Sequence, residues 1–125
     1  MKTISTPNAP KAIGPYSQGI KYDNLIFTSG QIPLKSNGEF LDSDIKEQTK
    51  QVLENLSNVL KVANSSLDSV VKTSVFLTNM DDFAAMNEVY EKYFRDNKPA
   101  RSTIGVKELP RGAKVEIECI AVADI

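Results

Sequence analysis

Arg101 and Glu116 are the two residues of this chain whose types and positions most clearly suit chemistry. An arginine can grip a carboxylate through two parallel hydrogen bonds, and a carboxylate on an inner strand can orient water or accept its proton. Lys98-Pro99 holds the preceding chain extended, so Arg101 begins a strand instead of a flexible loop. A structural ion pair or surface position is the alternative for Arg101, and a solvated carboxylate is the alternative for Glu116.

Histidine is absent from the sequence, and Cys119 is its only cysteine. The absence of histidine excludes serine triads, cysteine–histidine pairs and the commonest metal ligand. Cys119 lies in the apolar run 117–122, which favours a buried and inert thiol. Chemistry in this chain must therefore use arginine, carboxylates, tyrosine, hydroxyls, backbone amides and water.

The segment 114–119 alternates in the manner of a strand with two different faces. Glu116 and Glu118 share one face, and that face continues into Ile120 and Val122. We therefore predict that Glu116 is partly buried, whereas Glu118 is solvated.

The charge of the chain argues against nucleic acid as a partner, because its formal net charge is −1 and such binders usually carry a clear basic excess. Locally, the segment 92–114 carries seven basic and two acidic residues. Most of these charges are expected on a solvated face, but they are compatible with a small anionic ligand near Arg101.

At 125 residues, the chain is expected to form one domain over 1–125. No basic, apolar leader precedes Thr3, and no run approaches the roughly 18 apolar residues of a membrane span. We expect a cytoplasmic protein that does not bind membranes.

The pattern of apolar residues and turn residues predicts an α+β fold with both helices on one face of a sheet. Two such helices leave the other face uncovered, although the strands expected at 70–77 and 117–122 are apolar toward both faces. We therefore predict a homo-oligomer in which other subunits cover the second face. The expected elements are a hairpin of strands at 20–22 and 25–28, a helix from 45 to about 64, a strand at 70–78, a helix over 83–94, and a final pair of strands at 101–106 and 115–122 joined by a turn at 109–112.

Four motifs occur in order along nearly the whole chain: Gly14-Pro15-Tyr16-Ser17-Gln18-Gly19, Thr28-Ser29-Gly30-Gln31-Ile32-Pro33, Pro99-Ala100-Arg101-Ser102 and Val115-Glu116-Ile117-Glu118. Together they resemble the motifs of the RidA (YjgF) family of reactive intermediate deaminases. The resemblance implies a chorismate-mutase-like mixed sheet with two helices packed on one face. It also implies a homotrimer whose sheets form a central barrel with ligand clefts between subunits.

The activity that the resemblance implies is hydrolysis of 2-imino or enamine acids, such as 2-aminoacrylate and 2-iminobutanoate, to 2-oxo acids and ammonia. No metal or organic cofactor is implied. Arg101 matches the arginine that binds the substrate carboxylate, and Glu116 matches the glutamate that holds the attacking water. The other matched site residues are Tyr16, Ser29, Gly30, Asn87 and Thr103.

Two positions depart from the family pattern and bear on the shape of the cleft. Thr103 stands where many members have cysteine, and Lys98 stands where an aromatic residue is common. Two other functions stay open: a regulatory protein that binds 2-oxo acids, and an RNA-directed translation inhibitor or endoribonuclease. Only the basic segment 92–114 supports the RNA function, which would lack the usual histidine or metal.

Overall fold

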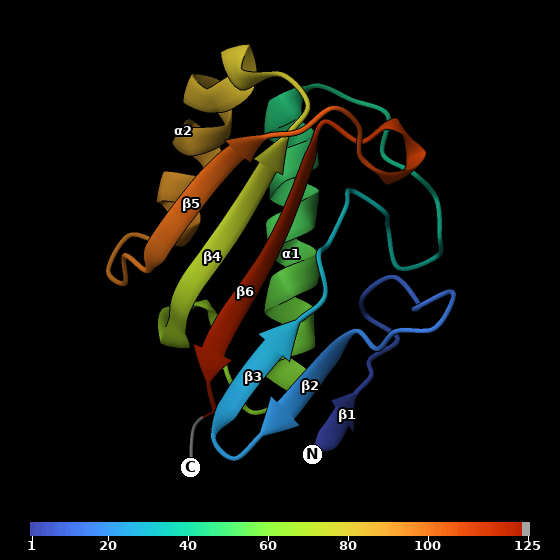
Figure 1. Cartoon of the computed structure of the whole chain (residues 1–125), viewed down its shortest axis with the longest axis vertical. Helices are drawn as coiled ribbons and strands as arrows, with labels where there is room; N and C mark the ends of the chain where they lie inside the picture. The colour runs from blue at the N-terminus through green and yellow to red at the C-terminus, as the bar shows by residue number, and fades with distance from the viewer. Residues whose placement is uncertain (124–125) are drawn as a thin grey trace.

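A six-stranded mixed sheet in the order β1-β2-β3-β6-β4-β5 organises the computed structural model, which describes residues 1–123 (Figure 1). Both helices lie on the same face of this sheet (Figure 1), so the predicted α+β fold is confirmed. The elements are β1 (Lys2–Ile4), β2 (Gly19–Tyr22), β3 (Leu25–Thr28), α1 (Ile45–Val62), β4 (Val70–Leu77), α2 (Phe83–Tyr93), β5 (Ala100–Gly105) and β6 (Val115–Val122), with short 3-10 turns at Leu67–Ser69, Met80–Asp82 and Pro110–Gly112.

The last two strands do not pair with each other, so the prediction of a final strand pair is wrong. Instead, β5 runs parallel to β4 at the edge of the sheet, and β6 lies between β3 and β4, antiparallel to both. The reason is α2, which connects β4 to β5 as a crossover and so places them side by side in parallel. The edge strand β1 was not predicted, since its three residues carry no clear strand pattern.

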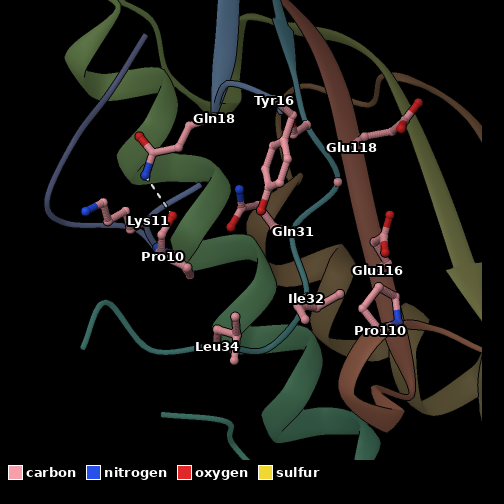
Figure 2. A pocket seen from close by; sticks show the side chains of 12 residues that line it. Pro10, Lys11, Tyr16, Gln18, Gln31, Ile32, Leu34, Pro110, Glu116 and Glu118 are labelled. Carbon is pink, nitrogen blue, oxygen red and sulfur yellow. Dashed lines mark hydrogen bonds between the residues drawn. The ribbon is translucent and has the colours of Figure 1, made fainter. Parts of the chain in front are cut away.

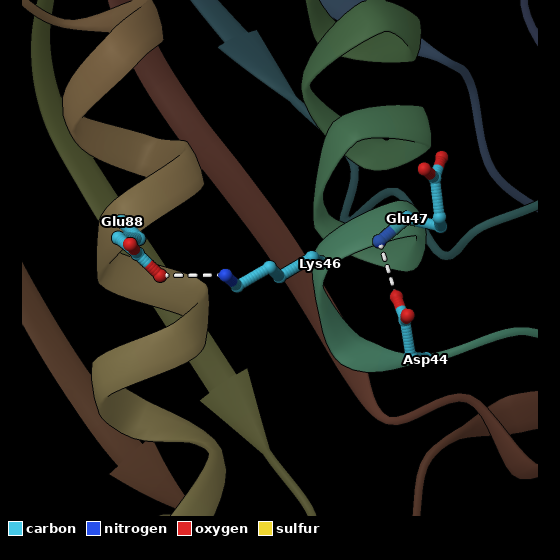
Figure 3. Close-up of polar contacts among 4 residues, drawn as sticks. All are labelled: Asp44, Lys46, Glu47 and Glu88. Carbon is cyan, nitrogen blue, oxygen red and sulfur yellow. Dashed lines mark hydrogen bonds and ion pairs between the residues drawn. The ribbon is translucent and has the colours of Figure 1, made fainter.

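Helix α1 begins where the Asp44 side chain accepts a hydrogen bond of 2.9 Å from the Glu47 N–H. Its apolar stripe is buried against the sheet, with Val52, Leu56 and Leu60 fully enclosed. An ion pair of 2.8 Å between Lys46 and Glu88 connects α1 with α2 (Figure 3). Because both of these side chains are exposed, the pair contributes little stability.

Helix α2 buries Met86 and Tyr90, and Phe94 packs just beyond its end. The prediction that the methionine and aromatic stripe belongs to the core is therefore confirmed. Tyr90 also faces Arg101, at a point where the core meets a surface hollow.

The two faces of the sheet differ in burial. Ile26, Val75 and Ile117 point to the helices and are fully buried. Phe27 and Ile104 lie on the opposite face and remain 40% and 48% exposed. This open apolar face supports the prediction of an oligomer, which stays a prediction. No helix within residues 1–123 has the length and apolar character needed to cross a membrane.

Candidate active site

Glu116 lies on the open face of β6, at the edge of a hollow of about 460 Å³. The predicted residues Tyr16, Ser29 and Gly30 line the same hollow. Figure 2 shows Tyr16 and Gln31 on one side of it, with Glu116 and Glu118 on the β6 side. The structure thus brings four of the seven predicted site residues together from three separate segments of the chain.

Gly30 is required for the position of the Glu116 side chain. A Cβ atom added at Gly30 would overlap the Glu116 carboxylate, lying only 2.7 Å from its Cδ. The carboxylate is therefore held directly against the backbone that follows β3. Any larger residue at position 30 would displace it.

The Glu116 carboxyl is a stronger base than an ordinary glutamate. Partial burial, and to a lesser degree the nearby Glu118 charge, raise the pKa of Glu116. The side chain is partly buried and Glu118 is exposed, as predicted. A raised pKa makes Glu116 better suited to take a proton from water.

A buried amide, Gln18, holds the loops around this hollow. Its Oε1 accepts from the Thr6 N–H at 2.7 Å, and its Nε2 donates to the Thr6 and Pro10 carbonyls at 3.1 and 2.8 Å. The Gln18 carbonyl in turn accepts from the Ser29 N–H at 2.9 Å. Gln18 belongs to the first sequence motif, but no role was predicted for it. Its place as a polar residue beside Gly19 in that motif was the available signal.

The Ser29 hydroxyl is committed to the protein, since it donates to the Ser17 carbonyl. Its proton therefore holds the two motif loops together and is not directed to a ligand, although its lone pairs can still accept. Gln31 completes the wall by exchanging backbone hydrogen bonds of 2.9 and 3.1 Å with Ile117 of β6. Tyr16 is 54% exposed and forms the outer rim.

Arg101 lies in a second hollow of about 350 Å³, between β5 and α2. Its Nη1 donates to Asn87 Oδ1 at 2.7 Å, and its guanidinium carbon is 4.7 Å from the Tyr90 ring centroid and 5.5 Å from that of Phe83. Within residues 1–123, no carboxylate forms an ion pair with Arg101. The guanidinium is thus fixed by neutral groups and keeps its charge for another partner.

Thr103 is two residues further along β5 and shares the face of Arg101. Its Oγ1 is buried and, among the described residues, has no hydrogen-bond partner. Lys98 lines the Arg101 hollow but turns its Nζ to the Arg95 carbonyl at 2.7 Å. Thr103 and Lys98 depart from the family pattern, but neither one pairs with the Arg101 guanidinium or closes its hollow.

The two hollows are separate within one chain. Arg101 faces the helix side of the edge strand β5, because its register partner Thr73 is buried there. Glu116 faces the open side of β6, and β4 lies between these two strands. A single chain therefore does not bring Arg101 and Glu116 to one small ligand.

Cys119 takes no part in either hollow. It is buried, and this burial raises the pKa of its thiol to about 12. The predicted burial of this thiol is confirmed, and its inertness stays a prediction. No cluster of three or more possible metal ligands occurs among residues 1–123.

Comparisons with known proteins match nearly the whole chain. The family model described as endoribonuclease L-PSP matches residues 6–123. The chain is 48% identical over 122 residues to a 2-iminobutanoate/2-iminopropanoate deaminase of Mus musculus, covering 97% of this chain and 90% of the mouse protein. Other relatives are named as chloroplastic in Arabidopsis thaliana and mitochondrial in Schizosaccharomyces pombe, so a cytoplasmic location stays a prediction.

Solved structures share the fold over almost the full length. A crystal structure from Thermotoga maritima superposes with a TM-score of 0.96 at 48% identity, covering 100% of this chain and 99% of that one. The structure of Escherichia coli TdcF with bound serine gives a TM-score of 0.94 at 41% identity, covering 99% of this chain and 100% of that one.

Proposed function

This chain belongs to the RidA (YjgF) family, also called the endoribonuclease L-PSP family, and we propose that it hydrolyses 2-imino acids to 2-oxo acids and ammonia. The observation that carries the proposal is the Arg101 guanidinium, which is held by Asn87 and two aromatic rings without an ion-pair partner in residues 1–123. The deaminase name of the mouse relative and the small amino acid bound in TdcF support the same substrate class.

Arg101 binds the carboxylate of the substrate. One N–H of Arg101 Nη1 donates to Asn87 Oδ1. The remaining N–H groups of the guanidinium can donate to the two oxygens of a carboxylate. Charge-assisted hydrogen bonds of this kind contribute about 1.5–3 kcal/mol each. The Asn87 amide keeps its own N–H donors for the ligand, which agrees with its predicted place beside the substrate.

Glu116 holds and activates water. As the water oxygen bonds to the imine carbon, Glu116 takes one of its protons, and the C=N bond becomes a C–N single bond. The nitrogen takes that proton back from Glu116, and the hydroxyl proton then passes to the nitrogen through the same carboxylate. Ammonia leaves as the oxygen forms the C=O of the 2-oxo acid, and Glu116 is again ionised. The raised pKa of Glu116 suits these transfers.

The site is completed by assembly. Arg101 and Glu116 line separate hollows on opposite faces of one sheet. We therefore place the Arg101 edge strand of one subunit against the Glu116 hollow of a neighbour in a homotrimer. The exposed Phe27 and Ile104 on the open face give that association its apolar surface.

The direct test generates 2-aminoacrylate in situ with a serine dehydratase and follows release of the 2-oxo acid and ammonia. The protein is expected to accelerate release above the rate in water, and Arg101→Ala is expected to remove the acceleration. Saturable binding of 2-oxobutanoate without turnover would instead support the regulatory function, and absence of both would refute the proposal.

A further inference from the structure

Three residues on one face of α2 form the support of Arg101. Phe83, Asn87 and Tyr90 are separated by four and three positions, so they follow one stripe of the helix. Each one contacts the guanidinium, two with ring faces and one with an amide oxygen. Arg101, the proposed clamp for the substrate carboxylate, is thus supported by a packed helix and not by a loop.

Tyr90 is the most firmly held of the three. It is 7% exposed, its ring lies 4.6 Å from that of Phe94, and its hydroxyl is 2.7 Å from Thr73 Oγ1. Thr73 is fully buried in β4, directly opposite Arg101 in the sheet register. The strand pair that carries the arginine therefore also anchors the ring beneath it.

A neutral ring supports a cation differently from an acidic side chain. A carboxylate partner would neutralise Arg101 and compete with an incoming acid. A ring face attracts the cation, yet leaves its N–H edge unoccupied. The Tyr90 ring therefore favours one orientation of the guanidinium while keeping its charge available.

We propose that Tyr90 is a positioning residue for the carboxylate clamp: its ring, locked to β4 through Thr73, fixes the plane of the Arg101 guanidinium before the ligand arrives. The kinetic part of this inference rests on the proposed function. The fixed guanidinium itself does not depend on that function, and it can be measured without any substrate.

Two measurements test the role of the Tyr90 ring. The first is nitrogen-15 NMR relaxation of the Arg101 Nε–H group in the protein without ligand. This group should be rigid in the wild type and mobile in Tyr90→Leu, whereas the Nε–H group of the exposed Arg95 should be mobile in both. In imine hydrolysis, Tyr90→Leu should raise KM roughly tenfold and leave kcat within about twofold, because the lost cation–ring contact supports binding of the carboxylate.

Control variants separate positioning from folding. Tyr93→Phe removes a tyrosine hydroxyl from the same helix, one that bonds Glu54, and should change neither readout. Should Tyr90→Leu not fold, the double variant Tyr90→Phe/Thr73→Val keeps the ring but releases its anchor, and KM should rise about threefold for one lost hydrogen bond.

An Arg101 side chain equally rigid without the ring, or an unchanged KM in a folded Tyr90 variant, would overturn the inference. Absence of imine turnover in the wild type would refute the proposed function instead. The relaxation measurement would then still decide whether Tyr90 fixes the guanidinium.

Discussion

The hollow around Glu116 and the hollow around Arg101 are assembled in different ways. Glu116 is enclosed by segments far apart in sequence, joined by the Gln18 amide, by Ser29 and by the Gln31 bridge to β6. Arg101 is supported by one helix and one strand pair, which are consecutive in the chain. In the proposed reaction, the water and the substrate carboxylate are therefore held by structurally independent parts of the molecule.

Because the two hollows are independent, we expect them to control different kinetic parameters. Damage to the Glu116 hollow should lower kcat, whereas damage to the Arg101 hollow should raise KM, because the first acts on the reaction and the second on binding. The proposed assembly adds that the two parts of each site belong to different subunits.

The largest effect is expected from mixing two inactive variants. At substrate concentrations far below the raised KM of Arg101→Ala, this variant and Glu116→Ala should each be almost inactive alone. When they are refolded together, about a quarter of the sites in random trimers should combine an intact Arg101 with an intact Glu116 from a neighbour. Activity should therefore reappear in the mixture. Mixing Arg101→Ala with the Arg101→Ala/Glu116→Ala double variant is the matched control and should recover nothing. No recovery in the first mixture would show that one chain supplies both residues.

Arg101→Lys should lose about 10- to 100-fold in kcat/KM although the charge is kept, because a point charge lacks the planar fork of the guanidinium. Steady-state kinetics of imine hydrolysis measure this loss. Arg95→Lys, an exposed position outside both hollows, should be unaffected. Near-normal turnover in Arg101→Lys would contradict the clamp.

Gly30→Ala should lower kcat about tenfold and change KM much less, since the three atoms nearest the added Cβ all belong to the Glu116 side chain, which it displaces. A raised KM with a normal kcat would contradict the assignment of the Glu116 hollow to the reaction and of the Arg101 hollow to binding. Adding Glu116→Asp to Gly30→Ala shortens the displaced side chain, so part of the lost kcat should return.

The smallest expected effect concerns pH. Burial and Glu118 raise the pKa of Glu116, so kcat should fall as the pH drops through that raised value and the base becomes protonated. Glu118→Gln removes the lesser cause, and the acidic limb of the profile should move slightly to lower pH. High salt should shrink this difference, because Glu118 is exposed. If the acidic limb of the Glu118→Gln profile moved to higher pH, the proposed repulsion between the Glu116 and Glu118 carboxylates would be ruled out.

Sequence patterns were reliable where a single element carries the information. Strict alternation over 115–119 predicted which faces Glu116, Glu118 and Cys119 take, and the structure confirms all three. The apolar stripes of both helices were equally informative, because side-chain periodicity follows from local geometry. Tyr16, Ser29 and Gly30 of the Glu116 hollow were also predicted, but through the family resemblance and not through periodicity.

Patterns failed where distant segments had to meet. The pairing of β5 with β4 depends on the path of α2, which no strand pattern records. Gln18 and Gln31 gain their roles only from partners on other segments. Tyr90 was assigned to the core correctly, yet its contact with Arg101 depends on how α2 packs across the sheet.

The order of residues alone thus established the available chemistry: no histidine, an arginine at the start of a strand and a glutamate on an inner strand. It also established the α+β fold, since backbone preferences and apolar periodicity act over a few residues. The folded chain showed that these two groups occupy separate hollows on opposite faces. Their separation depends on strand order and crossover, which arise from long-range packing that local sequence does not encode.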